Sequence, residues 1–147
     1  FLIEPNVRVG GSRILYFGAE LEWSEKVFSI VEDYSANPGK RKPSLRVCLD
    51  GMSGEATSNC CRCEKCLRAI ASLVVCGENP SEWGFDHCDP LLENAGEIFS
   101  NIRIPRCNAY HWRRIKKTAS ERLEAAPREL SPLLSLLARW DLSSHLF

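Results

Sequence analysis

Apolar positions recur along most of the chain at the spacing of an α-helix. The clearest pattern follows Glu64, where apolar residues repeat every three or four positions up to Gly77, a residue type that commonly ends helices. Similar patterns predict helices over residues 21–31, with Ser24 as N-cap, and over residues 108–125. The chain is therefore expected to be mostly α-helical.

Two dipeptides in which a capping residue precedes proline predict further helix starts. Asp89-Pro90 opens a helix that reaches about Ile102, and Ser131-Pro132 opens a last helix. The apolar side of this last helix suits either a core or a docking face for a partner, and consists of Leu133, Leu134, Leu136, Leu137 and Trp140.

Short apolar runs predict two strands, Ile14–Phe17 and Leu45–Leu49. Two strands are too few for a self-sufficient α/β sheet, so they are interpreted as the edge of a larger one. We expect an α/β region at residues 1–50, a cysteine-rich segment with its helix at 48–78, and a helical region at 89–147.

Composition narrows the classes of protein. Lys and Arg number 19 and Asp and Glu also number 19, which excludes a strongly basic or acidic tail. The longest uncharged apolar stretch, residues 69–77, is far shorter than the roughly 20 residues that span a membrane. The chain begins at Phe1 and its one methionine is Met52. We therefore expect a piece of a larger protein.

Four of the eight cysteines lie within seven residues of one another. The triplet Cys60-x2-Cys63-x2-Cys66 follows Cys48 across an eleven-residue loop. Four thiolates at this spacing favour a tetrahedral, structural Zn²⁺ site. Such clustering is typical of a reducing compartment, so the sequence predicts a cytoplasmic protein.

Two alternatives to zinc stay open. Iron–sulfur clusters also use the C-x2-C-x2-C spacing, although their fourth cysteine usually follows soon with a proline, and here Cys76 precedes Gly77. The four cysteines also suit a set of buried, reduced thiols. Cys61 breaks the spacing and is not expected to be a ligand, while core positions are expected for Cys76, Cys88 and Cys107.

The residues from Cys48 to Arg68 resemble a known family. Cys48 followed by Asn59-Cys60-x-Arg62-Cys63-Glu64-Lys65-Cys66-Leu67-Arg68 is similar to the zinc-binding C-terminal segment of ATP-pyrophosphatase proteins. These belong to the adenine nucleotide alpha-hydrolase superfamily, which includes 7-cyano-7-deazaguanine synthase. The resemblance covers roughly residues 12–78. It departs at Cys61, where glycine is usual, and at Trp23, where a basic residue is common.

The resemblance implies that the chain is the C-terminal part of a larger, Rossmann-like α/β enzyme that adenylates its substrate with ATP and releases pyrophosphate. Its phosphate loop, Ser-Gly-Gly-x-Asp-Ser, is absent, because residues 9–13 have the glycines without the aspartate. This chain alone is therefore not expected to be catalytic. It is expected to associate with an N-terminal ATP-binding part or with itself, and Arg68 is a candidate to face the nucleotide, the alternative being a surface arginine.

One segment is strongly basic. Residues 103–122 hold seven Lys or Arg and one acid. Candidate contacts to phosphate or nucleic acid are Arg113, Arg114, Lys116 and Lys117. A zinc-knuckle module that binds nucleic acid is thus an alternative function, and an iron–sulfur redox module is another. The simpler interpretation is a solvated helix face, with Trp112 and Ile115 packed inward.

Overall fold

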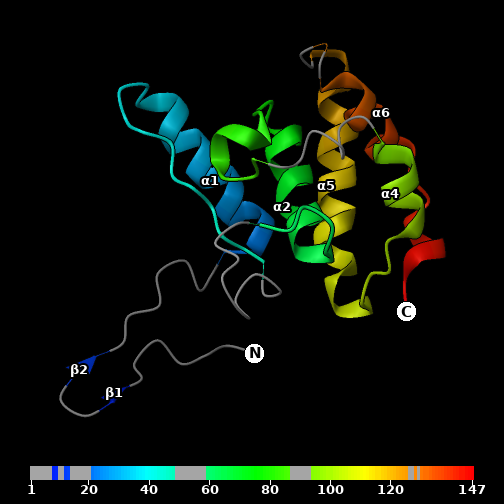
Figure 1. Cartoon of the computed structure of the whole chain (residues 1–147), viewed down its shortest axis with the longest axis horizontal. Helices are drawn as coiled ribbons and strands as arrows, with labels where there is room; N and C mark the ends of the chain where they lie inside the picture. Colours follow the sequence, from blue (N-terminus) through cyan, green and yellow to red (C-terminus); the bar gives the residue numbers. More distant parts are fainter. Residues whose placement is uncertain are drawn as a thin grey trace.

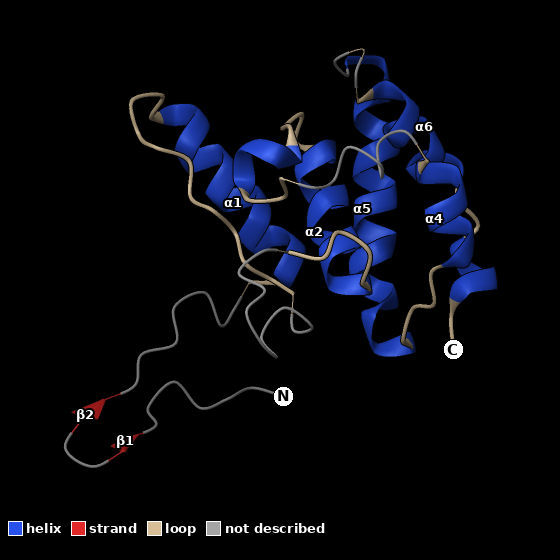
Figure 2. Ribbon diagram, viewed as in Figure 1, coloured by secondary structure: helices blue, strands red, loops and turns tan. Residues whose placement is uncertain are grey.

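The computed structural model describes residues 8–9, 12–13, 21–48, 59–86, 94–125, 128 and 130–147. Helices dominate this part of the chain, as expected (Figures 1 and 2). The α-helices are α1 (Trp23–Ala36), α2 (Glu64–Val75), α4 (Ala95–Asn101), α5 (Ala109–Arg122) and α6 (Ser131–Arg139). Single 3₁₀ turns are η2 (Pro80–Trp83), η3 (Arg106–Asn108), η4 (Leu123–Ala125) and η5 (Leu142–His145). None of the described helices is long and apolar enough to cross a bilayer.

Helix α2 is the centre of the fold. It contacts α1 on one side and α5 on the other (Figure 1), and every residue from 66 to 75 is buried. Its predicted end is confirmed, because Gly77 adopts φ +84° and donates its N–H to the Val74 carbonyl at 2.9 Å. The next N–H, of Glu78, reaches the Leu73 carbonyl at 3.1 Å, which completes a Schellman motif.

Helix α1 begins one residue before the predicted N-cap. Glu22 has extended backbone, and its N–H donates to the Glu25 side chain at 2.8 Å. The prediction of Ser24 as N-cap is therefore wrong: Ser24 is buried within the first turn. The acidic pair three residues apart provides the cap instead. The helix also runs five residues past Val31, to Ala36.

The predicted strand at Leu45–Leu49 is not formed over its described residues, 45–48. These residues are extended, but no second strand pairs with them, because the backbone N–H groups of Val47 and Cys48 donate to the side chain of Asn59. The predicted strand Ile14–Phe17 lies outside the described residues.

The described strands are β1 (Arg8–Val9) and β2 (Ser12–Arg13), an antiparallel pair that places Val9 opposite Ser12. Each strand is two residues long. In sequence, the two strands flank Gly10 and Gly11, the glycines that the phosphate loop would share with this chain. The described residues therefore contain no edge of a larger α/β sheet.

Aromatic rings form the core between α4, α5 and α6. Phe99, Trp112 and Trp140 pack edge to face, with ring centroids 5.2–5.9 Å apart. The predicted helix at 108–125 is confirmed as α5 and η4. Helix α6 begins at Ser131 with Pro132 in its first turn, so the N-cap is Leu130 rather than Ser131.

The apolar side predicted for α6 faces the core, with Leu133, Leu134 and Leu137 fully buried. Helix α4 ends at Asn101, as predicted within a residue, while its predicted start at Asp89-Pro90 lies outside the described residues.

Candidate metal centre

Four cysteine side chains from two segments converge on one point. The sulfurs of Cys48, Cys60, Cys63 and Cys66 all lie within 4.8 Å of one another. The Cys48–Cys63 and Cys60–Cys66 Sγ pairs are both 3.9 Å apart. Four thiolates around one zinc at about 2.3 Å form a tetrahedron with edges of about 3.8 Å, whereas disulfide sulfurs are only about 2 Å apart. The sequence-predicted ligand set is therefore brought together as free thiols with the spacing of a single ion.

The start of α2 sets the positions of three of these sulfurs. Cys63 is the N-cap residue, with extended backbone at φ −75° and ψ 159°, and Cys66 lies in the first turn. The N–H of Cys63 points at the sulfur of Cys60, 3.4 Å away. An N–H donated to sulfur stabilises its thiolate form, and the helix N-terminus adds a partial positive charge at the same place.

Cys61 turns the chain between Cys60 and Cys63. It has φ +54°, the only described non-glycine residue with positive φ, and its side chain is buried. Its sulfur is 3.7 Å from the Asn59 carbonyl and does not join the four-sulfur cluster. The Cys61 sulfur thus lies outside the cluster, and its exclusion from the ligand set stays a prediction.

Asn59 joins the extended segment that carries Cys48 to the rest of the fold. Its side-chain oxygen accepts hydrogen bonds from the N–H groups of Val47 and Cys48, at 3.0 and 3.2 Å. Its amide nitrogen donates to the carbonyls of Leu45 and Gly84, at 2.7 and 2.8 Å. All the hydrogen-bonding capacity of this buried amide is used.

Sequence reasoning assigned no role to Asn59. Its place directly before Cys60 is the only available signal, because its partners lie 11 to 25 residues away in sequence.

Burial disfavours the negatively charged thiolate form of the clustered cysteines. It raises the pKa of the Cys63 and Cys66 thiols above the usual range, and the neighbouring Cys63 thiol raises the pKa of Cys66 further. A divalent cation would supply the charge that holds four thiolates together at neutral pH. The donor set therefore fits a thiophilic metal ion, with Cys48, Cys60, Cys63 and Cys66 as the residues that would hold it.

A polar network borders the centre at Glu64, the residue after Cys63. One carboxylate oxygen of Glu64 accepts from the Trp112 indole at 2.8 Å, and the other accepts from the Asn108 amide at 3.1 Å. Both donors belong to the start of α5. The residue that follows the candidate ligand Cys63 thus joins α2 directly to α5.

Arg68 extends this network inward. Its guanidinium lies 3.5 Å from Glu64 and stacks over the Trp23 ring at 4.9 Å from the centroid. The alternative that Arg68 is a surface arginine is wrong, because only 6% of the residue is exposed. Burial, followed by the charge of Arg68, lowers the pKa of the neighbouring His111. Arg68 lines none of the described cavities, and facing a nucleotide stays a prediction.

The remaining thiols differ from one another. Cys76 is half-buried and burial raises its pKa to about 11, as suits an unreactive thiol near the core. Cys107 is exposed, so its predicted core position is wrong; it lies in η3, a turn on the surface. Cys88 lies outside the described residues.

The basic residues of α5 fall into two groups. Lys116 donates to the Trp140 carbonyl and Arg114 pairs with Glu25 at 2.7 Å, so both connect elements of the fold. Arg113 and Lys117 are exposed. The simpler interpretation is confirmed for the inward face, because Trp112 and Ile115 are 1% and 0% exposed.

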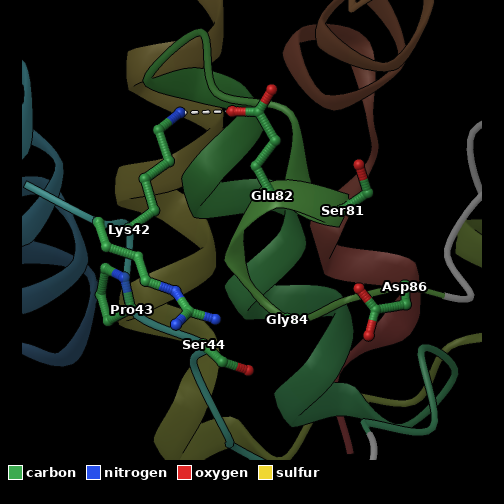
Figure 3. Close-up of a pocket in the computed structure, with 8 residues that line it drawn as sticks. Lys42, Pro43, Ser44, Ser81, Glu82, Gly84 and Asp86 are labelled. Atoms are coloured by element: carbon green, nitrogen blue, oxygen red, sulfur yellow. Dashed lines mark hydrogen bonds and ion pairs between the residues drawn. The ribbon is translucent and has the colours of Figure 1, made fainter. Parts of the chain in front are cut away.

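A separate cavity lies away from the four clustered cysteines. It has a volume of about 760 Å³ and is lined by both acidic and basic side chains, including Lys42, Glu82 and Asp86 (Figure 3). Lys42 pairs with Glu78 and Glu82 at its rim. Gly84, with φ +90°, forms part of the wall where a side chain would collide with Ser44. Two of its charged lining residues, Lys42 and Glu82, are paired with each other, and no cysteine lines it.

Comparison with protein-family models, with curated proteins and with solved structures finds no match for this chain.

Proposed function

We propose that Cys48, Cys60, Cys63 and Cys66 bind one structural Zn²⁺, and that the chain is the zinc-stabilised C-terminal portion of an ATP-pyrophosphatase-like enzyme. The observation that carries the metal assignment is the convergence of four sulfurs within 4.8 Å. Four thiolates complete a tetrahedron around zinc and leave no position for a reactive water, so the role is structural.

The sulfur spacing favours a single ion over an iron–sulfur cluster. A four-iron cluster places a separate iron behind each thiolate, so its cysteine sulfurs stand farther apart than sulfurs that share one ion. The 3.9 Å pairs suit the shared ion. The colour of the protein separates these two possibilities, because zinc thiolates are colourless and iron–sulfur clusters absorb visible light.

The family assignment is supported by the cysteine order and by the backbone at Cys61. The resembling family has glycine after the first cysteine of its triplet, and here that position has φ +54°, a conformation that glycine adopts without strain. In this proposal, ATP binding and adenylation belong to a separate N-terminal part, and this chain supplies a rigid zinc-bearing end.

Elemental analysis of the purified chain tests the metal. We expect about one zinc per chain and no visible absorption. Cys63→Ser should lose the zinc, whereas Cys61→Ser and the exposed Cys107→Ser should retain it. A folded, metal-free wild type with all four thiols open to alkylation would contradict the proposal.

A pyrophosphate-release assay, run beside light scattering, tests the assignment to the enzyme family. The chain alone should not consume ATP, and it should associate with itself or with an added ATP-binding part. Turnover by the isolated chain would show that a catalytic site exists within it. A monomer that retains zinc but joins no such part would contradict the family assignment while leaving the zinc site intact.

A further inference from the structure

Helix α5 has two faces with different chemistry. Its inner face packs against the core through Ala109, Trp112, Ile115 and Ala119, all buried. On the other side, four residues at intervals of four, three and four are exposed, and we call them the α5 basic face: Arg106, Tyr110, Arg113 and Lys117. Within α5 these intervals keep Tyr110, Arg113 and Lys117 on one side of the helix, and Arg106 precedes them in η3.

The cations of the α5 basic face are available to a ligand. Arg113 has no ion-pair partner among the described residues, and neither has Arg106. Lys117 lies 3.8 Å from Glu121, but the side chains are 77% and 59% exposed, and such pairs contribute little. The α5 basic face therefore presents three cations to solvent, with the weakly engaged Glu121 beside it.

An aromatic ring lies among these cations. Tyr110 is 48% exposed, one of the few large apolar side chains that the described surface presents. Its ring stands at 74° to that of His111, with centroids 5.8 Å apart, so His111 does not stack face to face on it. Tyr110, Arg113 and Lys117 line one concave surface of about 450 Å³ together with Arg114, Thr118 and Glu121.

We propose that the α5 basic face binds single-stranded nucleic acid. Arg113 and Lys117 are about 6 Å apart along the helix axis, so they can contact successive phosphates, while a base stacks on Tyr110. A nucleic-acid duplex fits this face less well, because its bases are already stacked on one another and would not use the exposed ring. An acidic peptide would use the cations but has no base to stack on Tyr110. An anionic membrane surface would require several apolar side chains on the same face.

Fluorescence anisotropy of the zinc-loaded full chain tests the proposal. The probes are labelled 20-mers of oligo-dT and oligo-U, with a 20-base-pair duplex for comparison, between 50 and 200 mM salt. Three phosphate contacts predict a slope of log K against log salt of about −2, at about −0.7 for each contact on single strands. Both single strands should bind more tightly than the duplex.

Two substitutions separate charge from stacking. Arg113→Gln should reduce the salt slope by about 0.7. Tyr110→Ala should weaken binding about tenfold with the slope unchanged, and Tyr110→Phe should restore it. Lys40→Gln removes an exposed cation beside Asp33, far from the α5 basic face in sequence, and should leave binding unchanged. Unchanged zinc content and melting temperature confirm that each variant folds.

Other outcomes would overturn the proposal. If Tyr110→Ala and Arg113→Gln bind like wild type, the face is not the site. If the duplex binds as tightly as the single strands and Tyr110→Ala has no effect, the interaction is general attraction to a polyanion. If polyglutamate or phosphatidylserine vesicles compete better than oligo-dT, the partner is an acidic protein or a membrane.

Discussion

The segments around the cysteine centre and the helices around Trp112 are stabilised by different interactions. Residues 45–48 and 59–63 have no regular secondary structure and are held by the Asn59 side chain and by the converging sulfurs. Helices α4, α5 and α6 instead interlock through the rings of Phe99, Trp112 and Trp140. The comparison indicates that polar side chains, together with the proposed metal ion, position the segments that carry the cysteines, whereas apolar rings position the helices.

Metal removal should produce the largest difference between the two regions. Structural zinc contributes on the order of 10 kcal/mol in zinc-finger peptides, so chelation should abolish amide-exchange protection over residues 45–48 and 59–63. Protection in α5 and α6 should persist, because their apolar core needs no metal. Hydrogen exchange with mass spectrometry, before and after chelation, measures both regions in one sample.

The matched control for chelation is Cys63→Ser, which should already resemble the chelated wild type and change no further on treatment. Equal loss of protection in α5 and α6 would mean that the two regions fold as one unit.

Phe99→Ala should give the opposite pattern. Removing this fully buried ring should lower the free energy of unfolding by about 3–5 kcal/mol while the chain retains its zinc. Phe28→Ala, at a half-buried position on α1, should cost less. Denaturant unfolding and elemental analysis give the two quantities, and loss of zinc in folded Phe99→Ala would show that the core also holds the centre.

Asn59→Asp should affect the cysteine side more gently. The carbonyls of Leu45 and Gly84 lose their donor, and a charged carboxylate replaces a buried amide, so a cost of about 2 kcal/mol is expected. Zinc affinity, measured by competition with a chromophoric chelator, should fall because Cys48 is less firmly placed. Asn101→Asp, on the exposed side of α4, serves as the control and should leave affinity unchanged.

Cys61→Gly should have the smallest effect. Glycine relieves the left-handed backbone but removes a buried side chain, so the stability should change by less than about 1 kcal/mol. Zinc content should stay the same. A loss of metal would show that the fifth thiol is a ligand after all.

Local signals predicted the parts of the fold that depend on neighbouring residues. The start of α2 near Glu64 and its end at Gly77 follow from spacing and from backbone freedom, and the four ligands follow from the cysteine intervals. The predicted N-cap at Ser24 was wrong because the acidic pair of Glu22 and Glu25 competed for the same role only three residues apart.

Features that depend on residues far apart in the sequence could not be predicted from local sequence patterns. The predicted strand at 45–49 had the right apolar composition, but Asn59 occupies the backbone groups that a neighbouring strand would need. The alternative of a surface position for Arg68 rested on the usual exposure of arginine, and only the packing of α1 against α2 brings Trp23 over it. The position of Cys107 on the surface depends in the same way on how η3 meets α5.

Helix α2 is buried on every side, with small residues such as Ala69, Ala71 and Ser72 at 0% exposure where its neighbours press against it. This arrangement constrains how the protein can evolve. Exposed charges on α1, such as Asp33, can change in a single step. A larger residue within α2 requires a compensating smaller one on α1 or α5. Across natural variants, residues 66–75 should therefore change in coupled pairs that conserve volume.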